Sequence, residues 1–380
     1  MAGIYIHIPF CKQACYYCDF HFSTSLKKKE ALVKALANEL WLRKEEFNAQ
    51  TVETVYFGGG TPSLLSVDEL QFLIAAVYDN YTVSDSVEIT LEANPDDLNG
   101  KRIYELKNTA INRLSIGIQS FFEADLKAMN RAHNAQEAKQ CLEEATKYFD
   151  NITIDLMYGI PGMSLEKWNQ NLQQAFEFNV NHISAYALTV ESNTAWDAFV
   201  KKGIYPPIDE ALARQHFNHL VSETRKHGFV HYEISNFGKP DYFSRHNTAY
   251  WQAKWYLGIG PSAHSFTGTE RCWNVSNNSK YIEAIQENRL PSTFEKLSVA
   301  DRYNEYVMTG LRTIWGISLT KVEQDFGVYF KNHLLREAEK FLAAKLLTIS
   351  NPDGKQQLLI TTQKGKFLTD GIASALFYLT

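Results

Sequence analysis

The chain contains 380 residues, of which 45% are hydrophobic and 21% are charged, and its formal net charge at pH 7 is −5. This composition is typical of a folded globular protein, and the acidic balance argues against nucleic acid as the main partner. No apolar run approaches the ~20 residues of a membrane helix, and the first ten residues lack the basic segment of a secretory signal. We therefore expect a cytoplasmic protein with no integral membrane segment.

Short apolar runs alternate with helical stretches through the first half of the chain. Repeated βα units predict a parallel sheet covered by helices, either an open doubly wound sheet or a complete or partial barrel. The predicted strands are 3–8, 52–57, 86–91, 113–118, 152–157 and 182–188. The predicted helices include 27–47, a helix opened by a capping box at Ser66 and Glu69, 101–107, 135–148 and 165–178.

The pattern changes after about residue 190, where helical segments dominate. The later elements are a helix over 210–227, an aromatic-rich block over 246–266, helices beginning at Ser298 and at a Thr320–Glu323 capping box, a strand over 358–361 and a last helix near 364–378. We expect three regions: a barrel over 1–235, an aromatic-rich connecting region over 236–296, and a small, mainly helical domain of winged-helix type over 297–380.

Three of the five cysteines form a C-x3-C-x2-C pattern, Cys11, Cys15 and Cys18, directly after the first predicted strand. An odd number of cysteines with this clustering does not indicate a disulfide framework. Three thiolates suit three irons of a [4Fe–4S] cube, and the fourth iron is then free to bind a small molecule through an amine and a carboxylate. S-adenosylmethionine (SAM) is such a molecule.

The alternative interpretation of the cysteines is a structural zinc site. A fourth zinc ligand would come from His7, Asp19 or His21. Zinc sites commonly pair two knuckles of this kind, and the remaining cysteines, Cys141 and Cys272, do not form a second one. The spacing therefore favours the iron–sulfur cluster over zinc.

An ordered set of motifs extends this interpretation along the chain. The segment from Tyr5 to Cys18 resembles the cluster loop of radical SAM enzymes, and with the later motifs the chain resembles the oxygen-independent coproporphyrinogen III oxidase family over nearly its whole length. The resemblance implies an α/β fold with a partial (βα)6 radical SAM barrel, a [4Fe–4S] cluster and SAM. The later motifs are Gly-Gly-Gly-Thr-Pro at 58–62, Glu-Ala-Asn-Pro at 92–95, Leu-Ser-Ile-Gly-Ile-Gln at 114–119, Asn-Arg at 130–131 and Ile-Asp-Leu-Met-Tyr-Gly-Ile-Pro at 154–161.

Taken singly, these motif residues also have structural interpretations. The glycines suit a tight strand-to-helix turn, Glu92 a turn before Asn-Pro, Arg131 a surface helix, and Asp155 a satisfied carboxylate inside a strand. The resemblance instead assigns Tyr5, Gly59 and Glu92 to the SAM bound at the cluster. It matches a further set to the position of a second SAM: Tyr17, Gly60, Thr61, Gln119, Arg131 and Asp155.

Two departures separate this chain from the oxidases of that family. Oxidases carry a Cys-Gly-Cys segment where this chain has Cys18-Asp19-Phe20, and they carry an extension before the first strand, which Gly3 already opens here. Both differences resemble the HemW branch, the haem chaperones that share the fold. The segment His-Asn-Thr-Ala-Tyr-Trp at 246–251 is similar to the H-N-x-x-Y-W motif of that branch.

The motif at 246–251 bears on haem. A histidine beside aromatic residues suits haem ligation, so His246 is a candidate haem-binding residue, and the structural alternative is an aromatic core with a hydrogen-bonded histidine. The resemblance implies a protein that binds haem and transfers it to client apoproteins, such as respiratory, membrane-associated haem enzymes. The alternatives are oxidative decarboxylation of coproporphyrinogen III, or another radical SAM chemistry such as methylation.

Overall fold

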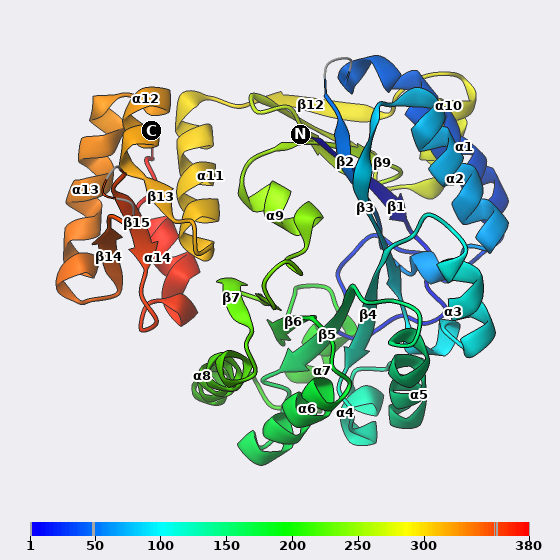
Figure 1. The fold of residues 1–380 in the computed structure, drawn as a ribbon, viewed down its shortest axis with the longest axis horizontal. Helices are drawn as coiled ribbons and strands as arrows, with labels where there is room; N and C mark the ends of the chain where they lie inside the picture. The colour runs from blue at the N-terminus through cyan, green and yellow to red at the C-terminus, as the bar shows by residue number, and fades with distance from the viewer. Residues whose placement is uncertain (1, 48–49, 353, 355, 380) are drawn as a thin grey trace.

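The computed structural model describes residues 2–47, 50–352, 354 and 356–379. Six parallel strands lie side by side in chain order at the centre of the molecule (Figure 1). They confirm the predicted strands, most of which the structure extends by one to three residues. These strands are β1 (Ala2–Ile8), β2 (Val52–Gly59), β3 (Val83–Ala93), β4 (Arg113–Gln119), β5 (Ile152–Tyr158) and β6 (His182–Ala187).

Helices pack on the outside of this sheet and confirm the α/β fold class (Figure 1). The predicted capping box is present, because the Ser66 side chain accepts a hydrogen bond from the Glu69 amide and the Glu69 side chain accepts one from the Ser66 amide. In the part of the chain that the structure describes, no helix has the length and apolar character needed to cross a bilayer. The outer helices are α1 (Lys29–Leu42), α2 (Val67–Asn80), α3 (Gly100–Lys107), α4 (Glu123–Ala128), α5 (Ala135–Ala145), α6 (Leu165–Glu177), α7 (Ala195–Lys201) and α8 (Glu210–Lys226).

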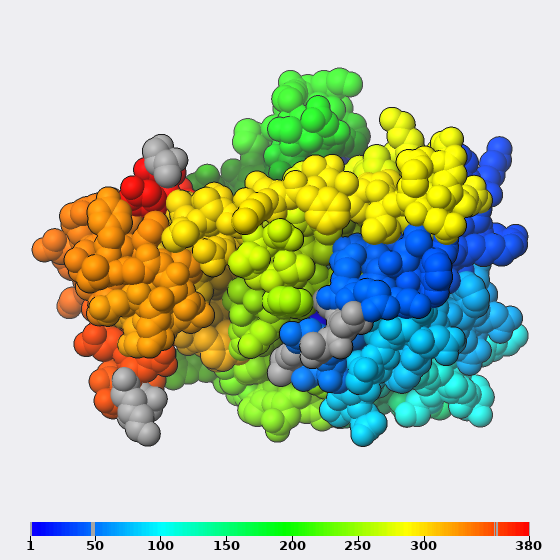
Figure 2. Space-filling model, turned by 90° about the horizontal axis from the view of Figure 1, so that it is seen from above, coloured from blue at the N-terminus to red at the C-terminus, as the bar shows by residue number. Residues whose placement is uncertain are grey.

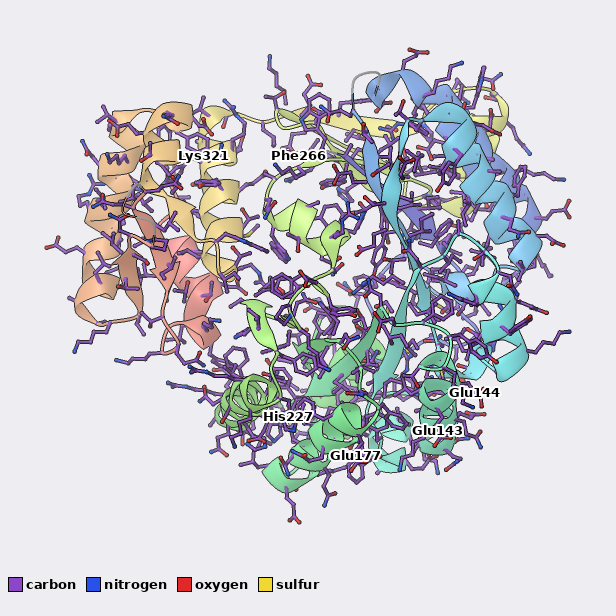
Figure 3. The ribbon with its side chains drawn as sticks, viewed as in Figure 1. Glu143, Glu144, Glu177, His227, Phe266 and Lys321 are labelled. Carbon is purple, nitrogen blue, oxygen red and sulfur yellow. The ribbon has the colours of Figure 1, made fainter. Side chains whose placement is uncertain are left out.

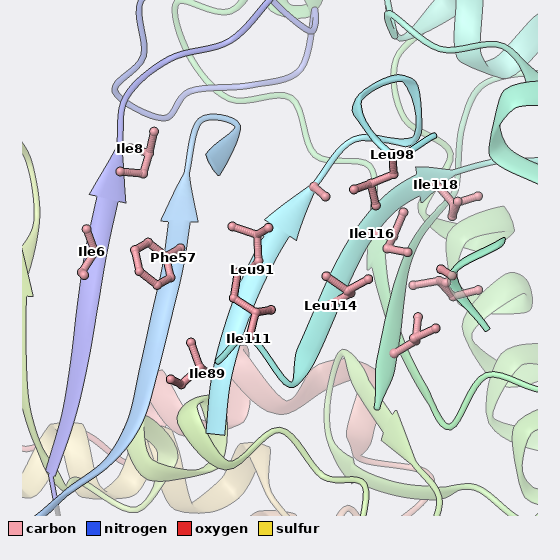
Figure 4. Close-up of a cluster of buried hydrophobic side chains, with 14 of the residues drawn as sticks. Ile6, Ile8, Phe57, Ile89, Leu91, Leu98, Ile111, Leu114, Ile116 and Ile118 are labelled. Atoms are coloured by element: carbon pink, nitrogen blue, oxygen red, sulfur yellow. The ribbon is translucent and has the colours of Figure 1, made fainter. Parts of the chain in front are cut away.

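The main hydrophobic core lies between these strands and helices. The buried stretches of these strands are mainly apolar because a parallel sheet covered by helices is largely buried. Ile6, Phe57, Leu91 and Ile116 are fully buried on four neighbouring strands (Figure 4). This core fixes the ends of the strands, from which the motif loops extend.

Short strands lengthen the sheet at both edges, to twelve strands within the described residues. β9 pairs with β1 in parallel, and β8 pairs with β6 antiparallel. These strands could not be predicted from the sequence because they have three to five residues and no clear alternation. The added elements are β7 (Val230–Glu233), β8 (Asn236–Gly238), α9 (Arg245–Trp251), β9 (Trp255–Ile259), β10 (His264–Phe266), β11 (Glu270–Asn274), α10 (Asn278–Gln286) and β12 (Ser292–Lys296).

The C-terminal part is mainly helical and has a hydrophobic cluster of its own. The helix beginning at Ser298 is confirmed, but the predicted capping box at Thr320 is wrong. Ser318 ends a two-residue strand and caps the helix instead, accepting from the Lys321 amide, so Thr320 lies inside the first turn. The elements are α11 (Val299–Arg312), β13 (Ile317–Ser318), α12 (Leu319–Phe326), α13 (Val328–Ala343), β14 (Leu347–Ser350), β15 (Leu358–Thr361) and α14 (Thr369–Ala375).

The C-terminal part is joined to the barrel at β7. The Ile234 amide donates to the Arg312 carbonyl at 3.1 Å, and the Arg312 guanidinium pairs with the buried Glu233 and lies over the ring of Trp251. The chain before α11, drawn in yellow, runs across from the barrel to the C-terminal helices (Figure 2). The two parts therefore meet next to α9.

Candidate functional site

The motif residues of the first half gather at the carboxyl ends of the parallel strands. The cysteine loop follows β1, and Gly59, Glu92 and Gln119 lie at or near the ends of β2, β3 and β4. Ligands of α/β barrels and open α/β sheets bind at this edge. The fold thus brings together motifs that are more than 100 residues apart in the chain.

The three motif cysteines are half-buried in one loop and form no disulfide. Burial raises the pKa of Cys11 and raises that of Cys18 to about 11, and the charge of Cys15 acts in the same direction on both. A bound metal reverses this direction because it stabilises thiolates. Among the described residues, no three Cys, His, Asp or Glu side chains converge on one point as ligands, so the thiols must turn toward one another to hold a cluster.

The histidines that could complete a zinc site both have protein partners. His7 Nε2 bonds the His21 carbonyl at 3.1 Å, and His21 Nε2 bonds the Asn278 amide oxygen at 2.8 Å. His7 Nδ1 also bonds the Tyr5 hydroxyl at 3.1 Å. The donors left in the loop are the three thiols and the exposed Asp19 carboxylate, and the thiols alone suit three irons of a cluster.

The glycine loop after β2 packs too closely for side chains. Gly59 has φ +109°, and a Cβ there would lie 2.5 Å from the ring of His7; a Cβ on Gly60 would lie 2.6 Å from the Phe10 carbonyl oxygen. Thr61 is buried beside them, and its hydroxyl accepts from the Asn94 amide at 3.2 Å. The Gly59 amide donates to Glu92 and the Gly60 amide to the Ile8 carbonyl, so glycine is required here because the turn packs closely against β1 and the cysteine loop.

Glu92 is the acidic group at this edge of the sheet. Its carboxylate accepts hydrogen bonds from the Tyr56 hydroxyl at 2.8 Å and the Gly59 amide at 3.1 Å. Burial raises the pKa of Glu92 to about 7, and the nearby Asp155 charge adds to the rise. Tyr5 stacks on Tyr56 with ring centroids 6.1 Å apart. A carboxylate in this position suits an amine or ribose hydroxyl, whose donors would satisfy it.

Arg131 links the cysteine loop to β4. Its guanidinium donates to Cys15 Sγ and the Tyr17 hydroxyl, both at 3.3 Å, to Asn94 Oδ1 at 2.6 Å and to the Gly117 carbonyl at 2.9 Å. Burial lowers the pKa of Arg131, but the neighbouring Tyr17 phenol and Cys15 thiol outweigh this effect and raise it. Arg131 is thus a half-buried cation beside a motif cysteine, and it lies in the loop after α4 and not on a surface helix.

Asp155 and Gln119 complete the second predicted set. Burial raises the pKa of Asp155 to about 6, against a hydrogen bond from Ser184 and the charge of Arg131. Gln119 is buried and has φ +64° at the end of β4. Asp155, a member of the second set, also interacts electrostatically with Glu92 of the first set.

His246 lies at the opposite, amino end of the barrel. Its Nδ1 bonds the Thr54 hydroxyl at 2.7 Å and its Nε2 bonds the Tyr250 hydroxyl at 2.8 Å, while its backbone amide donates to Glu88 at 3.1 Å. Burial lowers the pKa of His246 to about 3, so the ring is neutral. Coordination of iron by this ring would require it to give up one of these bonds.

Tyr56 and the polar contacts beneath it were not among the site residues predicted from the sequence. Tyr56 shares a face of β2 with Thr54, and the period-two pattern of a strand is the signal that could have placed it beside Glu92. Arg113 is buried at the start of β4, and its guanidinium bonds the Thr153 hydroxyl and lies 4.0 Å from Glu88. A charged residue opening an apolar strand could have indicated this buried group.

Comparison with known proteins agrees with this geometry. Residues 5–175 match the family model of the radical SAM superfamily, and residues 297–353 match that of the HemN C-terminal domain. Coproporphyrinogen III oxidase (HemN) from Escherichia coli has the same fold, with a TM-score of 0.84 and 22% identity over 99% of this chain and 90% of that one.

Relatives with higher sequence identity share nearly the full length. The protein named heme chaperone HemW of Lactococcus lactis is 32% identical over 97% of both chains, and that of Bacillus subtilis is 32% identical over 99% of both. A mitochondrial radical SAM domain-containing protein 1 of Mus musculus is 38% identical over 69% of this chain and 60% of its own. The chain therefore belongs to the HemW family within the radical SAM superfamily.

Proposed function

We propose that this protein is a haem chaperone, which binds haem and delivers it to client apoproteins. The full-length similarity to proteins named heme chaperone HemW supports this function most strongly. The similarity includes the C-terminal half, where the motif at 246–251 lies. We place the protein in the cytoplasm, with respiratory haem enzymes among its clients.

The carboxyl edge of the sheet is the proposed cofactor site. Cys11, Cys15 and Cys18 would hold the [4Fe–4S] cluster, which, with SAM, supplies a 5′-deoxyadenosyl radical when both are bound. The proposed partners of the first SAM are Tyr5, Gly59 and Glu92, and those of a second SAM are Tyr17, Gly60, Thr61, Gln119, Arg131 and Asp155. Burial of these groups would keep water from the reacting atoms.

The segment after Cys18 argues against the oxidase activity. Asp19 and Phe20 are exposed there, and Phe20 retains 66% of its surface, whereas the family's oxidases have a cysteine in this segment. At 22% identity, the similarity to the Escherichia coli oxidase supports a shared fold and not a shared activity. We therefore expect no conversion of coproporphyrinogen III.

Two assays test this function. Reconstituted protein is titrated with haem and then mixed with an apo-haem protein; a saturable spectral shift followed by transfer supports the chaperone. The same protein is incubated without oxygen with SAM, a reductant and coproporphyrinogen III. Formation of protoporphyrinogen at many turnovers, or failure to bind haem, overturns the proposal.

A further inference from the structure

A cavity of about 410 Å³ lies between α9, the strands β9 and β10, and the C-terminal helices α11 and α12. Ligand pockets of proteins commonly have volumes of about 300–1,000 Å³. Phe266 and Lys321 come from its two sides (Figure 3). The cavity is separate from the cysteine loop, because α9 contacts the amino halves of the strands and the loop follows their carboxyl ends.

The walls of this cavity combine aromatic rings with cations. Two of its cations already have acidic partners, since Arg271 pairs with Glu305 at 2.5 Å and Lys321 pairs with Asp325. The aromatic side chains come from both parts of the molecule: Tyr250, Trp251, Tyr256, Phe266, Tyr306 and Phe326. Flat apolar ligands pack well on such rings.

Arg302 of α11 differs from the other cations of the cavity. Its Nε is buried and has no hydrogen-bond partner, and within the described ranges no carboxylate pairs with its guanidinium. A buried donor without a partner costs free energy that a ligand can recover. A ligand carboxylate would satisfy the guanidinium with charge-assisted bonds.

The barrel side of the cavity is fixed by the motif at 246–251. The Tyr250 hydroxyl bonds His246, and the Tyr250 ring meets that of Tyr256 edge-on at 4.4 Å. Trp251 is held under the Arg312 guanidinium at 5.1 Å. The histidine of the motif therefore positions an aromatic wall, and the two aromatics of the motif face the cavity.

We propose that this cavity is the haem site, with the macrocycle between the aromatic side chains and a haem carboxylate on Arg302. This inference rests on the proposed function and names the ligand's place. His246 is then a positioning residue behind Tyr250. The shared chemistry, a flat macrocycle with carboxylates, fits haem and iron-free porphyrin alike, so the test includes both.

The first test compares haem with haem dimethyl ester, in which the carboxylates are neutral. Arg302→Gln should raise the Kd of haem about tenfold or more and leave that of the ester unchanged, because only the free acid uses the guanidinium. Arg336→Gln is the matched control, since Arg336 lies on α13 with 66% of its side chain exposed. An equal loss of affinity for haem and for haem dimethyl ester in Arg302→Gln would overturn the proposal. Iron-free protoporphyrin IX should show the same Arg302 dependence; dependence for haem alone would also overturn it.

The second test fills the cavity. Ala253 is exposed at its wall, so Ala253→Trp adds a ring there without disturbing the core. We expect haem binding to fall about tenfold or more while the free energy of unfolding stays unchanged. Haem affinity equal to that of the unmodified protein in both Ala253→Trp and Arg302→Gln would overturn the cavity. Failure of the unmodified protein to bind haem would instead overturn the proposed function.

Discussion

The ring of Tyr56 lies against the ring of His246, with centroids 5.0 Å apart and planes inclined by 23°. Tyr56 donates to Glu92 at the proposed SAM site, and His246 bonds Tyr250 on the cavity wall. Four side chains thus form a continuous series of contacts from one end of the barrel to the other. The two proposed cofactor sites are separate in space and connected through these rings.

Replacing His246 by Ala tests whether its ring positions Tyr250 or ligates the haem iron. We expect a loss of about 3 kcal/mol in the free energy of unfolding, from a buried cavity and two lost hydrogen bonds, measured by urea denaturation. Tyr250→Phe removes one of these bonds and should cost about 1 kcal/mol. Haem titration of folded His246→Ala should still saturate. Loss of the haem spectrum in folded His246→Ala, with Tyr250→Phe unaffected, would identify His246 as a ligand.

Replacing Cys11, Cys15 and Cys18 together by Ala should abolish iron–sulfur absorbance and SAM cleavage. Haem binding should survive, because the cysteine loop and the cavity lie at opposite ends of the barrel. Absorbance spectroscopy and SAM product analysis measure the first effect, and haem titration the second. Cys141→Ala is the control, since this thiol is buried on α5 away from the loop, and it should retain both activities. Haem lost with the cluster would mean a single site.

The buried carboxyl of Glu92 predicts a pH dependence of stability. Its folded pKa of about 7 is above the unfolded value, so the folded state favours the protonated form. Stability from this group is therefore fully present below about pH 4.5 and falls as pH rises through 7, by up to about 3 kcal/mol. The Glu92→Gln variant should lack this decline between pH 5 and 8 in urea denaturation without SAM. A parallel decline in the variant would assign the effect to other groups.

Arg131→Lys should loosen the cysteine loop. Lysine keeps the charge but loses the planar set of donors that reaches Cys15, Tyr17 and Asn94. We expect a loss of about 1–3 kcal/mol in stability, faster proteolysis within the loop, and weaker SAM binding. Arg225→Lys, an exposed position on α8, should change none of these. Unchanged proteolysis in Arg131→Lys would contradict the role of the guanidinium.

Gly59→Ala tests the close approach at the glycine loop. The added Cβ would lie 2.5 Å from the His7 ring at a positive φ, so we expect a cost above about 2 kcal/mol and loss of SAM binding, measured by thermal unfolding and SAM titration. Gly162→Ala is the matched control, because Gly162 has φ +82° with nothing within 4 Å of its Cβ position. It should cost only about 1 kcal/mol and bind SAM normally. Equal costs at the two positions would show that backbone strain alone matters.

The long strands could be predicted from the sequence and the short ones could not. β1 and β5 are mostly apolar runs rich in β-branched residues, a pattern that predicts strand type and position. β8 and β10 have three residues each, too few to show an alternating pattern, and β8 also depends on pairing with β6, about 50 residues earlier in the chain. Ser318 was missed as a cap because its place depends on β15, about 40 residues later.

The site was predictable where one motif holds the chemistry. The cysteine spacing and the three glycines can each be recognised within a short segment of sequence. The structure places both at one edge of the sheet. The surroundings of His246 were not predictable, since Thr54, Glu88 and Tyr56 reach it from strands more than 150 residues earlier. Local sequence shows that a histidine has aromatic neighbours, but not that both nitrogens are already bonded.

The position of α9 affects how the two ends of the barrel are separated. Glu88 accepts hydrogen bonds from the first two backbone amides of α9, and the side chain of His246 packs against Gly3 and Thr54. The helix α9 therefore covers the amino end of the barrel. Haem bound in the proposed cavity behind α9 would therefore be separated by protein from a radical formed at the proposed SAM site.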